Sequence, residues 1–269
     1  MRFVVVPLLF VLLFAGPGLF DRRFEGRGPR AEKSSSLSSY GASDDRFELP
    51  SREFSGVFGS SALLGGIALA QQSSVELSLN AQLVAGARNG DEALVRRALD
   101  AGAAPDSRNR VGDTALMIFV RKGNVPMVDL LLGKGADVNL RNLDKVSPLM
   151  AAVYHGHAGI ARVLLDRGAD MTAEDQIGKT SMVYAAGQGH SEIVGMLLEA
   201  GVDVNKLYKH DLTALMWAAG YGKADTVRLL LENGADPKLK DKRGKTARQI
   251  AAEAKHQLVA ELLTASESK

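Results

Sequence analysis

Apolar and small residues recur at a fixed interval of 33 residues through the C-terminal two thirds of the chain. The interval relates five hydroxyl positions and four aliphatic pairs: Thr114, Ser147, Thr180, Thr213 and Thr246, then Leu131/Leu132, Leu164/Leu165, Leu197/Leu198 and Leu230/Leu231. A constant period of this size is typical of a solenoid, in which each unit is one supersecondary element that cannot bury its apolar face alone. Function is therefore expected on an extended surface rather than in a single pocket.

Each unit has the same predicted order of elements. A Thr or Ser hydroxyl can accept backbone N–H groups as an N-cap, and it opens a short first helix. A glycine such as Gly156 ends that helix, a second helix carries the aliphatic pair, and a second glycine such as Gly168 ends it. Both glycines suit a residue in the left-handed region after a helix. The pattern predicts helix-turn-helix units joined by short hairpin loops.

The pattern T-x-L-x-x-A-A-x-x-G-H-x-x-I-V-x-x-L-L-x-x-G-A-D-V-N, fullest at Thr180 to Asn205, resembles the ankyrin repeat. The resemblance implies an all-α ankyrin-repeat solenoid, with a divergent N-terminal capping repeat at 79–108 and five repeats at 109–265. One departure recurs in every unit, because the His that ankyrin repeats usually carry after T-P-L is replaced by Met117, Met150, Val183, Met216 and Gln249. We expect packing to take the place of the hydrogen bond made by that His.

A hydrophobic leader occupies residues 1–20. Arg2 precedes an uncharged apolar run from Phe3 to Phe20, which favours an export signal or a membrane anchor over a buried core helix. The choice between signal and anchor stays open, because Pro7 and Gly16 are unfavourable in a long spanning helix and four arginines follow the run.

A second apolar segment spans 57–70, after a polar stretch at 21–56 that shows no helical or strand period and is interpreted as a flexible linker. It ends in Ala68-Leu69-Ala70, which is typical of a signal-peptidase site. One hypothesis is that translation begins downstream of Met1 and that cleavage follows Ala70. The chain is then exported, periplasmic or membrane-anchored in a bacterium, and a cytoplasmic location is the alternative.

Charge and cysteine content narrow the function classes. Lys and Arg exceed Asp and Glu by 33 to 31, so a nucleic-acid partner, which requires a clustered basic surface, is not expected. The chain has no Cys, which removes disulfides, thiolate catalysis and Cys-type zinc sites. We expect a monomer without a cofactor that meets a membrane only through its N-terminal segment.

Enzymatic motifs are missing from the sequence. It contains no Gly-rich phosphate loop, no nucleophile elbow and no H-E-x-x-H. His155 and His157 are two residues apart, and no third ligand follows at a metal-site spacing. We therefore expect no catalytic, cofactor-binding or metal-binding residues.

The resemblance implies a protein-binding function on a concave strip made by the hairpin tips and the exposed ends of the first helices. Carried over by register, the partner-binding candidates are Arg110, Arg121, Lys122, Tyr154, His155, Ile177, His210 and Tyr221. Tyr154, His155 and Tyr221 are the expected central contacts, since aromatic residues often anchor interfaces. Tyr184 and Trp217 are assigned to packing instead.

Two alternatives accompany this hypothesis. Exposed tyrosines and charges on a solenoid also occur as a merely solvated face. The chain as a whole is alternatively a membrane-tethered structural or spacing protein, in which the leader stays attached and the repeats organise partners.

Overall fold

The computed structural model describes residues 78–267. The predicted leader (1–20), linker (21–56) and second apolar segment (57–70) lie outside the described residues and stay predictions. Within 78–267, helix length and hydropathy together leave no segment able to cross a bilayer as a helix.

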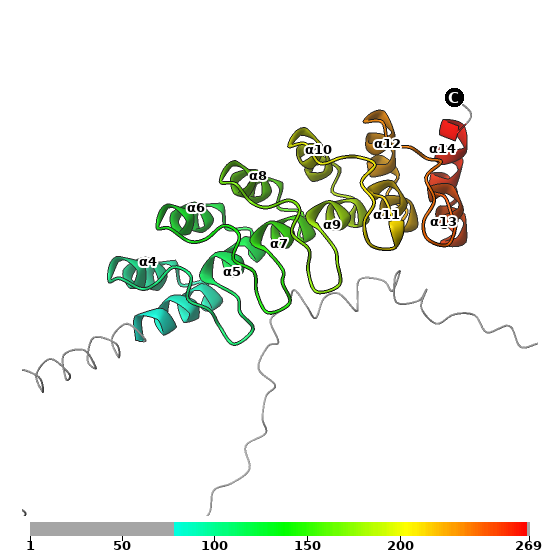
Figure 1. Cartoon of the computed structure of the whole chain (residues 1–269). Coiled ribbons are helices and arrows are strands. Elements are labelled where there is room, and N and C mark those ends of the chain that lie inside the picture. The colour runs from blue at the N-terminus through cyan, green and yellow to red at the C-terminus, as the bar shows by residue number, and fades with distance from the viewer. Residues whose placement is uncertain (1–77, 268–269) are drawn as a thin grey trace, which may run out of the picture.

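The described chain is a solenoid of paired helices, which confirms the predicted all-α class. Two rows run side by side in Figure 1, and the hairpin loops project from the inner row on the side away from the outer row. The inner row comprises the helix at 78–89, α5 (Ala115–Arg121), α7 (Pro148–Tyr154), α9 (Ser181–Gln188), α11 (Ala214–Gly220) and α13 (Ala247–Glu253). The outer row comprises α4 (Glu92–Asp100), α6 (Val125–Gly133), α8 (Ala158–Asp166), α10 (Ser191–Glu199), α12 (Ala224–Glu232) and α14 (Gln257–Glu267). We number as units 1 to 5 the helix pairs that begin with α5, α7, α9, α11 and α13, each with the hairpin before it.

One continuous apolar core lies between the rows. The first members of the aliphatic pairs are fully buried, and three of the second members are only partly buried: Leu165, Leu198 and Leu231. Met117, Met150, Val183 and Met216 are buried as well, so packing replaces the missing His in units 1 to 4. The expectation is wrong for the last unit, because Gln249 is exposed and its side chain accepts from the Thr246 N–H. Each helix pair buries its apolar stripe against its neighbours, as a solenoid requires.

The turn glycines are left-handed, as predicted, and a close approach adds a second reason for glycine. Gly156 has a φ of +72°, and a Cβ there would lie 2.6 Å from Cε1 of His190 in the next unit. The His190 ring is held in place because its Nε2 is hydrogen-bonded to the Tyr154 carbonyl at 3.3 Å. Lys255 replaces the equivalent glycine in the last unit and adopts a φ of +63°.

Helix capping follows the prediction in every unit except one. Hydroxyl oxygens accept the N–H three residues further on at Thr114, Ser147, Thr213 and Thr246. Thr180 caps nothing with its side chain, and its Oγ1 is buried without a hydrogen-bond partner. The expectation of a capping hydroxyl is therefore wrong for Thr180, in the unit that matches the repeat pattern best.

The hairpins form a hydrogen-bonded layer of their own. In units 1, 2, 3 and 5 an Asn or Asp at the base of the hairpin accepts the N–H groups two and four residues further on: Asn109, Asn142, Asp175 and Asp241. Backbone bonds then join neighbouring hairpins: Leu143 N–H to Val111 C=O (3.2 Å), Gln176 N–H to Asp144 C=O (3.1 Å) and Lys242 N–H to His210 C=O (3.0 Å). This layer presents the hairpin tips at fixed spacing.

Candidate functional site

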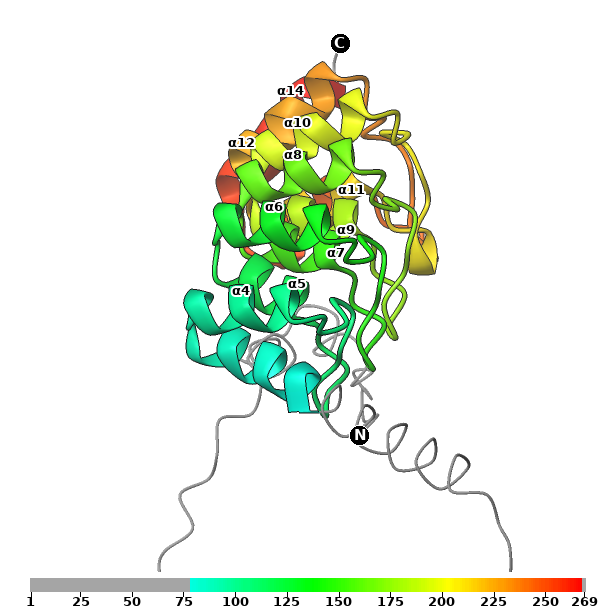
Figure 2. The ribbon, with the colours of Figure 1, turned by 90° about the vertical axis from the view of Figure 1, so that its left-hand side faces the viewer.

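The exposed sides of the inner helices and hairpins form one long surface, which we call the concave face after the resemblance described above. Figure 2 shows the hairpins stacked along one side of the helices. The residues of this face come from the same positions of successive units, so its shape is set by the stacking of the array. A face of this kind offers a rigid row of side chains to a large ligand.

Aromatic side chains gather at the centre of the concave face. The Tyr154 and Tyr184 rings meet edge to face at a centroid distance of 5.8 Å, and the Trp217 and Tyr221 rings stack at 6.2 Å. Lys179 places its ammonium 4.6 Å from the centroid of the Trp217 ring. Tyr184 and Trp217 are buried, which confirms their assignment to packing, whereas Tyr154 and Tyr221 are half-buried and keep one side exposed.

Burial at the centre of the face favours the neutral form of the Tyr221 phenol. Burial raises the pKa of Tyr221, and the neighbouring Tyr154 raises it further. Tyr184 is held through its hydroxyl, which donates to Asp175 Oδ2 at 2.5 Å. The Tyr221 phenol therefore stays neutral and acts as a hydrogen-bonding group on an apolar surface.

His155 is the most accessible residue of the predicted centre. It is exposed at the end of α7, and its ring stacks on the His157 ring at 5.8 Å while meeting Tyr154 edge to face at 5.3 Å. His157 itself is tied to the preceding unit through a 3.1 Å hydrogen bond between Nε2 and the Arg121 carbonyl. The structure therefore brings Tyr154 and His155 together on one side of the face.

Arg121 and Lys122 are engaged in contacts within the array. The Arg121 guanidinium donates to both carboxylate oxygens of Asp113, at 2.6 and 2.9 Å, and only 12% of its side chain is exposed. The Lys122 ammonium donates to the Ala87 and Arg88 carbonyls, both at 2.8 Å, at the end of the first described helix. The prediction that Arg121 is exposed at the end of the first helix is therefore wrong. Its guanidinium is held against the protein by the bidentate pair with the buried Asp113 carboxylate.

The other three candidates lie on the hairpins. Arg110 is exposed, while Ile177 and His210 are partly buried. The exposed Val111 follows Arg110, and the exposed Leu143 lies on the hairpin of unit 2, so the hairpin tips carry apolar as well as charged side chains. The structure thus places the candidates in two groups, one along the hairpin tips and one at the ends of the inner helices.

Basic residues are concentrated at the two ends of the face. The first hairpin carries Arg108 and Arg110, and the last carries Lys238, Lys240, Lys242, Arg243 and Lys245. Burial acts to raise the pKa of Asp241, but hydrogen bonds from the Lys245 N–H and from Arg243 outweigh it and hold that pKa below its usual range. Asp241 therefore stays ionised and partly neutralises the positive charge of the last hairpin.

Tyr208 is a structural departure that sequence reasoning missed. It replaces the Asn or Asp at the base of the unit 4 hairpin, is 9% exposed and carries a phenol oxygen without a hydrogen bond of ordinary geometry. Burial raises its pKa to about 12, against a smaller lowering by the Thr180 hydroxyl. The Thr180 hydroxyl thus lies near the Tyr208 phenol and makes no capping bond to α9. The signal was available, because Tyr208 is the one member of its 33-residue column without an amide or carboxylate.

Comparison with protein families gives a match over most of the chain. The family model described as "Ankyrin repeats (3 copies)" matches residues 83–175 and 182–269. No curated protein matches the chain. Ankyrin repeats generally mediate protein–protein interaction, and proteins built from them are typically non-enzymatic scaffolds. In the part of the chain that the structure describes, no cluster of His, Asp and Glu has a geometry suited to a metal ion.

Proposed function

The chain belongs to the ankyrin-repeat proteins, and from this premise we propose that it is a non-enzymatic scaffold that binds a protein partner through its concave face. The observation that carries the proposal is the contact of the exposed His155 ring with half-exposed Tyr154, which packs on buried Tyr184, together with half-exposed Tyr221, which stacks on buried Trp217. Large rings held by packing present apolar area and polar edges together, which suits interface anchors.

Preorganisation supports the proposal energetically. Tyr154 is held against Tyr184, and Tyr221 is held against Trp217, so neither ring has much rotamer freedom left to lose on binding. Ordering a flexible side chain at an interface costs about 0.5–1.5 kcal/mol. A partner that meets this face avoids most of that cost, and Arg110, Ile177 and His210 on the hairpins extend the contact area.

Site-specific photocrosslinking tests the location of the interface. A photoreactive phenylalanine analogue replaces His155 on the concave face or, as the matched control, the exposed Arg162 on the outer helix α8. In cells that express the protein, we expect a covalent adduct with a partner from position 155 and little from position 162. Adducts formed only from position 162 would place the interface on the outer helices and overturn the proposal.

A second variant tests the energetic role of the predicted centre. The triple change Tyr154→Ala, His155→Ala and Tyr221→Ala should weaken capture of the crosslinked partner at least tenfold, since truncating interface anchors costs on the order of 2 kcal/mol each. Because Tyr154 and Tyr221 also pack on neighbouring rings, thermal unfolding is followed in parallel and capture is measured well below the transition. Unchanged capture by the folded variant would remove these three residues from the interface.

The uncharged run from Phe3 to Phe20 favours a second candidate, in which the chain is a membrane-tethered spacing protein. Export from a bacterial cell with cleavage after Ala70 is the opposing alternative, because cleavage there removes that run. Fractionation separates the tether from export. Retention of the full chain in the membrane pellet after an alkaline wash supports the tether, and release of a shortened soluble chain supports export.

A further inference from the structure

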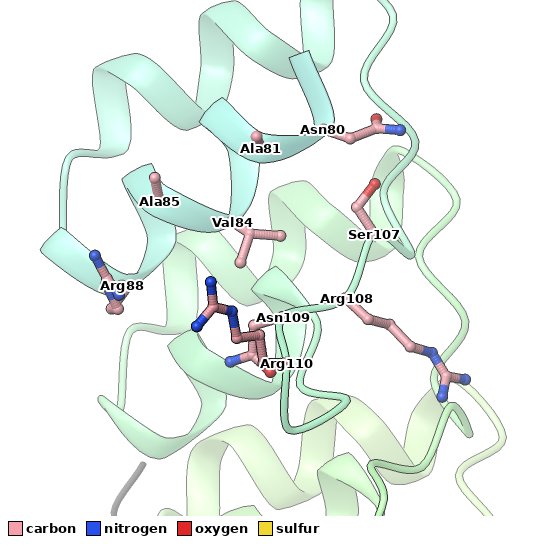
Figure 3. A pocket seen from close by; sticks show the side chains of 9 residues that line it. All are labelled: Asn80, Ala81, Val84, Ala85, Arg88, Ser107, Arg108, Asn109 and Arg110. Atoms are coloured by element: carbon pink, nitrogen blue, oxygen red, sulfur yellow. The ribbon is translucent and has the colours of Figure 1, made fainter. Parts of the chain in front are cut away.

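A groove of about 510 Å³ lies at the N-terminal end of the concave face, between the helix at 78–89 and the first hairpin. Its apolar wall consists of Ala81, Val84 and Ala85, and its polar residues include Arg88, Arg108 and Arg110. Among the described residues that line it, none is Asp or Glu. In Figure 3, Arg110 reaches back from the hairpin towards Val84 and Arg88, whereas Arg108 extends away from them.

Within residues 78–267, the two arginines that face the groove have no carboxylate partner. Among the described residues, no Asp or Glu oxygen lies within ion-pair distance of Arg88 or Arg110. Arg121 in the same unit shows the contrasting case, because Asp113 takes both of its terminal nitrogens. Two unpaired guanidinium groups beside an apolar wall favour a ligand that carries both carboxylates and aliphatic carbon.

The hydrogen-bonded hairpin layer also begins at this groove. In unit 2, the Leu143 N–H donates to the Val111 carbonyl at 3.2 Å, and Asn142 Nδ2 donates to the Asp113 carboxylate at 3.0 Å. Arg110 and Asn109 hold the same two positions one unit earlier. Within residues 78–267, no acceptor meets the Arg110 N–H or Asn109 Nδ2, because a helix and no hairpin precedes the first hairpin.

Comparison of the two hairpins shows which acceptor groups are missing beside the first one. The later hairpin satisfies these donors with a backbone carbonyl and a carboxylate from an extended neighbour. We propose that the groove binds an extended acidic segment of a partner protein. A backbone carbonyl of that segment accepts from the Arg110 N–H, one carboxylate accepts from Asn109 Nδ2, and further carboxylates pair with Arg88 and Arg110. An aliphatic residue of the segment packs on Val84.

This inference rests on the proposed function, since it names the chemistry of the partner at one end of the concave face. The proposed function and this inference can be contradicted independently of each other. Crosslinking from position 155 reports on the centre of the face and does not require the groove. Adducts from position 155 together with an inert groove would leave the proposed function standing and remove this inference alone.

Fluorescence anisotropy with a defined peptide tests the groove in the full chain. The probe is the decapeptide DSENEVGDTA, which copies residues 106–115 with both arginines changed to glutamate, so that it supplies the carbonyl and carboxylate of the hairpin motif. The comparison peptide NSQNQVGNTA has the same shape without the charges. We expect the acidic peptide to bind at least tenfold more tightly than the neutral one at 150 mM salt, where exposed long-range attraction is largely screened.

Paired variants separate a specific site from general attraction. The double change Arg88→Glu and Arg110→Glu should reduce the affinity for the acidic peptide at least tenfold. The double change Arg162→Glu and Arg167→Glu alters the net charge equally on exposed positions of the outer side and should reduce the affinity less than twofold. Equal losses in the two variants, or equal affinity for the two peptides, would overturn the proposal.

Amide hydrogen exchange and sedimentation identify other occupants of the groove. Exchange at the Arg110 N–H should be fast in the isolated chain and slow when the acidic peptide is bound. Slow exchange in the isolated chain at a concentration where it sediments as a monomer would show that its own residues before Ser78 fill the groove. A dimer that is lost on Arg110→Glu would assign the groove to a second copy. Either result overturns a partner protein as the occupant.

Discussion

The junction between units 2 and 3 and the junction between units 3 and 4 pack their helices in the same way but join their hairpins differently. At the first junction, the Gln176 N–H donates to the Asp144 carbonyl, and Asn139 bridges to the Asp170 N–H and to the Gly168 carbonyl. At the second, the described residues show no backbone bond between hairpins, and the Lys209 ammonium reaches the Ile177 carbonyl at 3.2 Å instead. Helix packing and hairpin bonding are therefore separable features of this array.

Departures from the repeat at Tyr208 and Thr172 account for the difference in hairpin bonding between the two junctions. Tyr208 lacks the side-chain acceptor that shapes the other hairpins, and His210 and Asp211 both adopt a positive φ, of 63° and 58°. Thr172 stands where Asn139 and Asn205 make their bridges, and its hydroxyl donates to Asp170 of its own hairpin instead. The hairpin of unit 4 is therefore less strongly coupled to the hairpin before it than to the hairpin after it.

The largest expected contrast between the two junctions is at their turn glycines. Gly156→Ala places a Cβ 2.6 Å from the hydrogen-bonded ring of His190, whereas Gly189→Ala meets the flexible Lys223 side chain at 2.8 Å. Both positions have a positive φ, so each alanine is strained. We expect Gly156→Ala to lower the free energy of unfolding by about 3 kcal/mol and Gly189→Ala by about 1.5 kcal/mol.

Urea unfolding monitored by circular dichroism measures both variants, and Gly168→Ala is the control. Gly168 has a φ of +80°, and no atom lies within 4 Å of the position that an alanine methyl group would take, so this alanine reports the backbone strain alone, about 1 kcal/mol. Equal losses at positions 156 and 189 would show that the ring of His190 yields as readily as the lysine. That result would remove this difference between the junctions.

The next contrast depends on pH and concerns Tyr208. Because burial raises its pKa to about 12, the folded state keeps the phenolic proton more tightly than the unfolded chain does. The resulting stability is complete below about pH 10 and is lost as the pH rises through 12, by on the order of 2 kcal/mol. Tyr208→Phe should therefore unfold with a shallower loss of stability between pH 10 and 12 than the parent chain.

A matched control for Tyr208→Phe is Tyr184→Phe in α9, the inner helix of unit 3. At pH 8, Tyr208→Phe should be neutral or stabilising, since its hydroxyl makes no ordinary hydrogen bond, while Tyr184→Phe should lose about 1 kcal/mol with its bond to Asp175. Thermal unfolding at pH 8 compares the two. A loss at Tyr208 as large as that at Tyr184 would show that the buried phenol is hydrogen-bonded in solution.

The smallest contrast exchanges the bridging residues themselves. Asn139→Thr removes two exposed hydrogen bonds between units 2 and 3 and should cost about 1 kcal/mol. Thr172→Asn supplies the corresponding groups between units 3 and 4 and should stabilise the chain by about 0.5 kcal/mol. Urea midpoints measure both. Changes of the same sign would indicate that the missing bridge does not explain the weaker coupling of the unit 4 hairpin.

Much of the fold followed from the sequence because its determinants are local or periodic. The buried aliphatic column, the left-handed glycines and four of the five capping hydroxyls were all predicted from residues within one unit. Thr180 was the exception, although its unit matches the repeat pattern best. Its hydroxyl is buried near the phenol of Tyr208, which lies 28 residues further on in the sequence.

The candidate site was predicted less completely, because register does not determine which side chains are engaged by neighbouring units. The positions of Tyr154, His155 and Tyr221 on one face follow from the repeat. The burial of Arg121 against Asp113 does not, since Asp113 has no acidic counterpart in its column of later units, where Val146, Lys179, Leu212 and Lys245 stand. The unpaired donors of the first hairpin, the Arg110 N–H and Asn109 Nδ2, follow only from the tertiary structure, in which the equivalent donors Leu143 N–H and Asn142 Nδ2 are paired.

By itself, the sequence determined the all-α repeat, its period, its core columns and the face on which a partner is expected. Those features depend on burial and backbone geometry that recur within each unit of 33 residues. The tertiary structure alone decided which hairpins are bonded, which hydroxyl loses its cap, and where the basic groove opens. These outcomes depend on hydrogen bonds and contacts between stacked units, whose partners are brought together only when the whole array has formed.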